Sequence, residues 1–354
     1  MLNGLPAPIS MSRGMNRLDA PLRGLVLDDL RFHDILRVTE TCRSWRAAIS
    51  SVTEIHWIKV EGLRAAHMMN KMTRCRFLCV DAQDFSVLRD MILPLAMMRD
   101  LQRVTIDFDE DVDKTSFAPS CDLLVRSGAL RTASNLLWFE LQVVGGDPLE
   151  EELLRSPAFK QLLDQMSPGC ALRAAVFGRV PASWVSEILS KGADPNDNPD
   201  PVAFDNIIHE ACDYQSIDVI RLLVDAGADP HRLNDSNQSV LHYSVSWRKS
   251  GVTDTLRYLL DLGVNARQVE LQSGWSVLHS LLDNEDVGRD EMLESVELLL
   301  SHDPSLASIP NIDGYTPLTW GLAGDDDYDE MDANHRAILR ALAEAEAKQR
   351  RKSK

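Results

Sequence analysis

Several features that mark large classes of proteins are missing from this sequence of 354 residues. Basic residues are fewer than acidic ones: the chain has 37 Lys and Arg and 54 Asp and Glu, which give a formal net charge of -17. A general affinity for nucleic acid or an anionic membrane requires a basic face, so we expect neither partner. No apolar run approaches the ~18 residues of a membrane span, and the first residues lack the apolar core of a signal peptide.

Sequence motifs of catalysis are also missing. The chain has no Gly-rich phosphate loop, HExxH, CxxC or GxSxG. Two acidic runs, Asp107–Asp111 and Asp325–Asp329, lack the glycine and the final glutamate of a calcium loop, so we interpret them as solvated loops. Six scattered cysteines form no framework, which favours a reducing compartment. We therefore expect a soluble protein of the cytoplasm, with the nucleus as the alternative, that is not an enzyme and holds no metal or cofactor.

The second half of the sequence contains a repeated unit, which is clearest over residues 206–230. Two short antiparallel helices are predicted there. Ile217, Ile220 and Val224 recur at helical spacing on one face of the second helix, with Leu223 beside them. Gly227 stands where a left-handed helix cap is expected. A unit this small cannot bury its apolar face alone, so it must stack on copies of itself.

Four further copies align with this unit, and together they resemble the ankyrin repeat family. The aligned apolar positions are 36, 33, 37 and 40 residues apart: Leu172, Ile208, Leu241, Leu278 and Leu318. The family unit has about 33 residues and a T-P-L-H-x-A opening, which Thr316–Leu318 and three histidines match: His209, His242 and His279. The resemblance implies a solenoid of about five repeats over residues 170–347. In this family the histidine hydrogen-bonds neighbouring backbone, so we do not expect a metal site at these positions.

The resemblance also implies where a target protein would bind. Partners of ankyrin proteins usually lie across the hairpin tips and the exposed face of each first helix. Six aromatic residues map to this surface: Tyr214, Tyr243, Trp247, Trp275, Tyr315 and Trp320. The alternative is that some of these rings pack between repeats, Tyr243 and Trp320 above all. Acidic neighbours indicate a target with a basic patch: Glu210, Asp213, Asp283 and Asp313.

A second motif occupies residues 16–54. From Ile35 onward, apolar residues at 35, 38, 42, 45 and 49 make one helical stripe. The stretch resembles the F-box, which docks onto the Skp-type adaptor of a cullin ubiquitin ligase, although Asp19 occupies the family's proline position. The resemblance implies these adaptor contacts: Leu18, Leu22, Val26, Leu27, Leu30, Ile35, Leu36, Cys42 and Trp45. An ordinary amphipathic helix whose apolar face is core is the alternative.

Residues 55–145 show a different period. Four segments share one short strand pattern and begin at Ile55, Cys75, Leu101 and Leu136. Helical patterns at 63–72 and 85–98 lie between them, and this alternation predicts parallel strands joined by crossovers. The spacing is similar to irregular leucine-rich repeats, and a small four-stranded α/β sheet is an equal interpretation.

The complete prediction is a mainly α-helical chain with a small α/β segment in the middle. A flexible lead (1–15) precedes the F-box-like region, and connector or capping helices (146–169) precede the ankyrin solenoid. The basic tail (348–354) is more readily a solvated helix end than a nuclear import signal.

Two functions fit this organisation. The first is a substrate-recognition subunit of a Skp–cullin–F-box ubiquitin ligase, in which the F-box docks the adaptor and the repeats bind the target. The second is an ankyrin scaffold that joins proteins without a ligase. Neither function requires the chain itself to make or break bonds.

Overall fold

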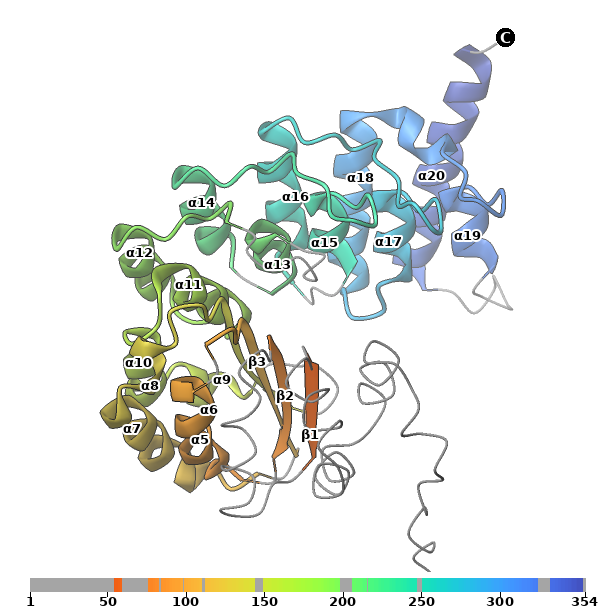
Figure 1. Cartoon of the computed structure of the whole chain (residues 1–354). Helices are drawn as coiled ribbons and strands as arrows, with labels where there is room; N and C mark the ends of the chain where they lie inside the picture. Colours follow the sequence, from red (N-terminus) through yellow and green to blue (C-terminus); the bar gives the residue numbers. More distant parts are fainter. Residues whose placement is uncertain are drawn as a thin grey trace, which may run out of the picture. The chain divides into compact units, whose positions relative to one another are not determined.

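The computed structural model (Figure 1) describes ten ranges of the chain: 54–58, 76–82, 84–97, 99–109, 112–143, 149–197, 206–214, 216–246, 250–323 and 332–352. The chain divides into two parts, Met1–Ala171 and Leu172–Lys354. The predicted F-box, with every adaptor contact from Leu18 to Trp45, lies outside the described residues. The helix expected at 63–72 does so too.

A four-stranded parallel sheet forms the centre of the first part. Its strands pair in sequence order and are β1 (Glu54–Ile58), β2 (Phe77–Ala82), β3 (Arg103–Phe108) and β4 (Trp138–Val143). The parallel pairing agrees with the strand–helix alternation of the sequence. Leu101 and Leu136, which open two of the predicted strand patterns, lie just before β3 and β4 and are buried there.

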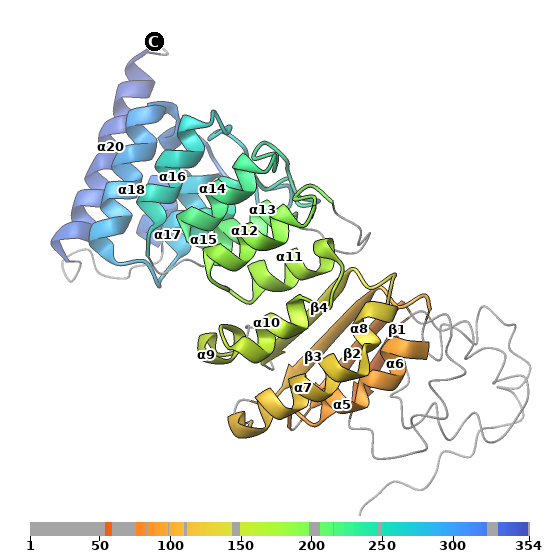
Figure 2. The ribbon, with the colours of Figure 1, turned by 90° about the vertical axis from the view of Figure 1, so that its left-hand side faces the viewer.

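The crossover helices of the first part lie on one face of this sheet (Figure 2). This placement follows from the topology, because parallel strands paired in sequence order are joined by crossovers of one hand. The helices are α5 (Val87–Asp90), α6 (Ile92–Met97), α7 (Phe117–Ser127) and α8 (Ala129–Thr132). The single helix predicted over 85–98 is therefore two short ones. Pro94 explains the division, because a proline is tolerated in the first turn of a helix but not in its interior.

The helix-facing side of the sheet is apolar and holds the core of this part. Val104, Ile106 and Phe108 of β3 are buried there. The Phe85 ring packs on Phe108 with centroids 4.5 Å apart and on Phe117 at 4.9 Å. Strand alternation sends every second side chain to the opposite face.

Polar side chains lie on the opposite face of β3 and β4. Glu140 is only 5% exposed, and its carboxylate accepts hydrogen bonds from Arg103 and Thr105, each at 3.3 Å. Burial raises the pKa of Glu140, which the Arg103 charge opposes. Asp107 accepts a 2.6 Å hydrogen bond from Gln142 Nε2. The interpretation of Asp107 as part of a solvated loop was wrong, because the residue belongs to β3.

Two short helices follow the sheet, α9 (Glu151–Leu154) and α10 (Pro157–Leu163). The break between them falls at Ser156, whose side chain caps α10 by accepting from the Phe159 N–H. Helix α10 packs against α7. The segment that the sequence assigns to a connector or a repeat cap thus packs on a crossover helix of the α/β part.

Five helix pairs make up the repeats, numbered 1 to 5 here. They are α11–α12 (Pro168–Phe177, Ala182–Ser190), α13–α14 (Ile207–Tyr214, Ile217–Asp225), α15–α16 (Val240–Ser246, Val252–Asp261), α17–α18 (Val277–Asp283, Arg289–His302) and α19–α20 (Pro317–Ala323, Ala333–Lys352). Helix α11 spans the division between the two parts. From α13 to α19 the first helices stack on one another, and α16, α18 and α20 form a second row (Figure 1).

Helix ends in the repeats follow local chemistry. The predicted cap at Gly227 is confirmed, because this residue has φ 98° and the Ala228 N–H bonds back to the Leu223 carbonyl at 2.8 Å. Repeat 4 lacks such a glycine. There α18 ends at His302, and Asp303 starts a short 3-10 helix, Pro304–Ser308, by accepting from the Ser305 N–H.

The buried face of α14 agrees with the prediction in part. Ile220 and Leu223 are buried as predicted, Val219 is buried with them, and Ile217 and Val224 are half-buried. Helix α14 packs against both α12 and α13. The buried stripe is therefore centred between these two neighbours, and Ile217 and Val224 fall at its margins.

The C-terminal helix α20 closes the array. Its inward side chains are buried as far as Glu346, including Ile338, Leu339 and Leu342. Beyond Glu346 the charged residues Lys348, Arg350, Arg351 and Lys352 are exposed. The part of the predicted basic tail that the structure describes is thus the last turn and a half of a helix.

Candidate protein-binding surface

Three tight hairpins precede the first helices of repeats 3, 4 and 5. They are called the third, fourth and fifth fingers, after the repeat that each one opens. A backbone hydrogen bond closes the base of each finger: Asn234 N to Gln238 O (3.0 Å), Glu270 N to Trp275 O (2.9 Å) and Asn311 N to Tyr315 O (2.8 Å). The turn residue has positive φ in every case, at Asn237 (63°), Gly274 (68°) and Gly314 (86°). These equivalent turns place side chains of successive repeats in register.

Neighbouring fingers are also bonded to each other. The Leu271 N–H donates to the Ser236 carbonyl at 2.9 Å, and the Ile312 N–H donates to the Ser273 carbonyl at 3.0 Å. The fourth and fifth fingers approach so closely that a Cβ at Gly274 would lie 2.9 Å from the Ile312 nitrogen. The fingers therefore form one continuous strip.

Buried histidines join the fourth and fifth fingers to the preceding repeats. The Ser276 N–H donates to His279 Nδ1 at 3.2 Å, and His279 Nε2 lies 3.0 Å from the Tyr315 carbonyl. A backbone N–H can only donate, so Nδ1 accepts and the ring proton on Nε2 donates to the carbonyl. His242 makes the same contacts with Ser239 and the Trp275 carbonyl. The predicted role is confirmed for both residues.

Burial lowers the pKa of His242 to about 4, although its hydrogen bonds with the backbone of Trp275 and Ser239 act in the opposite direction. Burial lowers the pKa of His279 as well. Both rings are therefore neutral at pH 7, which matches the single ring proton that their contacts require. His209 is fully buried, and its ring packs edge-on against Tyr243 with centroids 5.0 Å apart.

Three of the six predicted aromatic residues come together between the fourth and fifth fingers. The Trp275 and Trp320 rings have centroids 5.1 Å apart, and the Tyr315 and Trp320 rings 6.2 Å, both in edge-to-face arrangements. Trp275 and Trp320 are partly exposed, and Tyr315 is 43% exposed. We call these three residues the aromatic cluster.

Tyr243, another of the six predicted residues, lies outside the cluster. The Tyr243 hydroxyl accepts from Asn234 Nδ2 at 2.9 Å, and its ring packs on His209 of the preceding repeat. This ring thus packs between repeats, which is the alternative that the sequence leaves open for it. Tyr214 is the last residue of α13, and Trp247 lies outside the described residues.

The sequence reasoning missed two apolar side chains at the finger tips. Leu271 is 70% exposed and Ile312 is 67% exposed. Each follows the residue that opens its finger, a position that Asp235 holds in the third finger. An apolar residue directly after the first residue of a hairpin was the available signal, and recognising it requires the hairpins to be aligned first.

The acidic residues predicted to lie on the binding surface differ in their exposure to solvent. Asp313 is exposed beside Ile312, and Asp283 is exposed at the end of α17. Partial burial and the neighbouring Glu285 raise the pKa of Asp283. Asp213 is only 7% exposed. The inclusion of Asp213 among the surface acids was wrong, because it is a buried residue on the inner side of α13.

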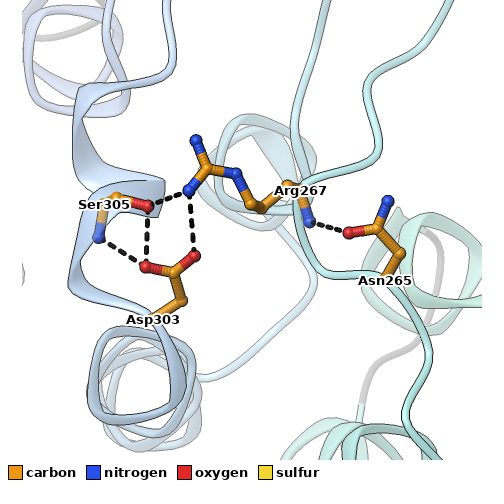
Figure 3. Close-up of polar contacts among 4 residues, drawn as sticks. All are labelled: Asn265, Arg267, Asp303 and Ser305. Carbon is orange, nitrogen blue, oxygen red and sulfur yellow. Dashed lines mark hydrogen bonds and ion pairs between the residues drawn. The ribbon is translucent and has the colours of Figure 1, made fainter.

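A polar bridge ties repeats 3 and 4 together at their outgoing loops (Figure 3). Arg267 Nη1 donates to Asp303 Oδ2 at 3.3 Å and to Ser305 Oγ at 2.6 Å. Burial raises the pKa of Asp303, but hydrogen bonds from Ser305 and the Arg267 charge outweigh burial and lower it. Such bridges fix neighbouring repeats, and therefore their fingers, relative to each other.

The described ranges contain no group of three or more His, Cys, Asp or Glu side chains that could hold a metal ion. None of the helices in these ranges combines the length and the apolarity that crossing a membrane requires.

Comparisons with known proteins address the repeats. The family model described as ankyrin repeats (3 copies) matches residues 171–269. A solved structure, an ankyrin repeat domain from Acinetobacter baumannii, is similar with 23% identity over 50% of this chain and 81% of that chain, at a TM-score of 0.40. No curated protein matches the chain. Residues 171–269 carry ankyrin repeats, and α17 to α20 continue the same succession of fingers and helix pairs.

Proposed function

We propose that the repeats bind a target protein along the fingers and the adjoining first helices, with the aromatic cluster at the centre of the contact. The observation that carries this proposal is the exposed pair Leu271 and Ile312 beside that cluster. Exposed large apolar side chains that gather in one place mark interaction surfaces. Trp and Tyr are also the residues that most often carry interface energy.

The test compares proteins captured from cell extract by the wild-type chain and by the double variant Leu271→Ser, Ile312→Ser. We expect the variant to lose specific partners without losing stability, because both side chains are solvated in the free protein. Leu123→Ser is the matched control, since Leu123 is an exposed leucine on α7 in the other part of the chain. Unchanged capture by the double variant would contradict the proposal.

We further propose that the chain is the substrate-recognition subunit of a Skp–cullin–F-box ubiquitin ligase. The support is the sequence motif from Leu18 to Trp45, placed ahead of a protein-binding repeat array. In this function the chain supplies proximity, because it raises the effective concentration of target lysines near the ligase. The partners would be a Skp-type adaptor, a cullin and a target that carries a basic patch.

Co-purification distinguishes this function from the second candidate, an ankyrin scaffold without a ligase. Tagged protein should retain the adaptor and a cullin, and Leu30→Asp with Ile35→Asp should abolish both while the repeats still capture their target. Each large apolar side chain removed from an interface costs roughly 1.5–3 kcal/mol. Retention of the adaptor by the double variant would exclude the F-box, and absence of adaptor and cullin from the wild type would favour the scaffold.

A further inference from the structure

The polar groups of the aromatic cluster have no hydrogen-bond partner among the described residues. This holds for the indole N–H groups of Trp275 and Trp320 and for the hydroxyl of Tyr315, whose printed side-chain contacts are ring contacts alone. Tyr243 differs, because its hydroxyl accepts a hydrogen bond from Asn234. The cluster thus presents three aromatic rings together with two indole donors and one phenol.

These groups select for a particular kind of ligand. Indole N–H groups only donate, so the ligand must bring acceptors. Aromatic rings and the exposed Leu271 and Ile312 require apolar contact at the same place. A polyproline II segment meets both requirements, because it makes no internal hydrogen bonds, leaves its backbone carbonyls free and presents flat pyrrolidine rings. Aromatic-lined surfaces recognise proline-rich segments in this manner.

Charge adds a second requirement. The Asp313 carboxylate is exposed beside Ile312 and accepts no hydrogen bond from any residue in the described ranges. Glu270, in the fourth finger, accepts from the Ser273 hydroxyl at 2.7 Å. With a net charge of -17 on the whole chain, a basic residue next to the proline-rich core of the ligand is favoured electrostatically.

We propose that the aromatic cluster of Trp275, Tyr315 and Trp320 binds a proline-rich segment of the target, in the polyproline II conformation and flanked by a basic residue. The proline rings contact the aromatic faces, and backbone carbonyls of the segment accept from the two indole N–H groups. Asp313 pairs with the flanking basic residue. This inference rests on the proposed function of the repeats as a protein-binding array.

The experiment probes the full chain against an array of immobilised twelve-residue peptides. One set carries Pro-x-x-Pro with every residue in turn at each x and an arginine at one end, and a matched set replaces each proline by alanine. A third set has random arginine-containing sequences without proline. We expect binding to members of the first set and loss of that binding in the alanine set.

Conservative variants then test the assigned groups. Trp275→Phe and Trp320→Phe keep a ring but remove the indole donor, and each should weaken binding of the best proline-rich peptide roughly three- to tenfold, as for one lost hydrogen bond. Asp313→Asn should weaken the binding of peptides that end in arginine. It should not change the binding of the same proline-containing peptides when alanine replaces that arginine. Tyr258→Phe on α16 is the matched control and should change nothing.

Equal binding of the proline and alanine sets would overturn the inference, and so would full binding by both indole variants. If proline-free arginine peptides bind and the double variant Leu271→Ser, Ile312→Ser loses them, the protein-binding function stands and this ligand class is wrong. If no set binds, this inference fails by itself, since the capture experiment with cell extract tests the wider function separately.

Discussion

At the scale of single residues, the buried histidines make stability depend on pH. The pKa of His242 is about 4 in the folded chain, against about 6.5 for an ordinary histidine. Between pH 4 and pH 6.5 this side chain is therefore protonated in the unfolded chain and neutral in the folded chain. The contribution of His242 to the free energy of unfolding is fully present above pH 6.5. It falls by about 3 kcal/mol as the pH drops towards 4. His279 acts in the same direction.

Urea denaturation at pH 7.5 and pH 5 measures this effect. His242→Ala should be less stable than wild type at pH 7.5 and should lose less on acidification. Glu140 acts in the opposite direction, because its raised pKa adds stability as the pH falls, so the difference between variant and wild type is the informative quantity. His302→Ala, at an exposed helix end, is the control. If His242→Ala lost as much stability as the wild type between pH 7.5 and pH 5, this role would be contradicted.

Gly274 tests the contact between fingers. Its φ of 68° costs any residue with a Cβ about 1–2 kcal/mol, and the new Cβ would also lie 2.9 Å from the Ile312 nitrogen. Gly314 has φ 86° but open space around it. Gly274→Ala should therefore destabilise the chain more than Gly314→Ala, as measured by urea denaturation. Equal losses of stability in the two variants would show that the fifth finger shifts to make room for the new Cβ at no cost in free energy.

At the scale of elements, a buried hydroxyl pair joins α16 to α18. Thr253 Oγ1 lies 2.9 Å from Ser295 Oγ, and both residues are buried. Thr253→Val keeps the shape but leaves the Ser295 hydroxyl without this partner, which should cost about 1–3 kcal/mol in the free energy of unfolding.

Adding Ser295→Ala to Thr253→Val should recover part of that loss, because no buried hydroxyl then remains unpaired. A double-mutant cycle by urea denaturation measures the coupling. Additive losses would show that the two hydroxyls do not interact. Arg267→Ala removes the exposed bridge of Figure 3 and should cost under about 1 kcal/mol.

At the scale of the whole molecule, α20 should decide whether the repeats are stable alone. Its buried residues cover α18 and the 3-10 helix Pro304–Ser308, and its outer face is polar. Terminal repeats with a polar outer face are what repeat arrays require for solubility. A fragment of residues 168–354 should melt cooperatively with a helical circular dichroism spectrum, whereas residues 168–331 should aggregate. A soluble, cooperative shorter fragment would mean that α20 is dispensable.

Features that depend on nearby residues could be predicted from the sequence. The helix pair of residues 206–230, the left-handed Gly227 and the histidine positions each follow from residues a few places apart, so repeat periodicity and local chemistry were sufficient. The strand–helix alternation of the middle segment likewise predicts its parallel pairing. These predictions rest on helix capping, backbone sterics and spacing, none of which requires knowledge of distant contacts.

Other features depended on residues far apart in the chain. Trp275 and Trp320 are 45 positions apart and meet only because two repeats stack. Asp107 gained its partner Gln142 through strand pairing, and Asp213 was buried by the packing of its own helix. The amino-acid sequence by itself determined the succession of helix pairs and the parallel pairing of the strands, because both follow from spacing and local chemistry. Only the tertiary structure decided which side chains are left exposed together, because burial is set by the neighbours that stacking brings into contact.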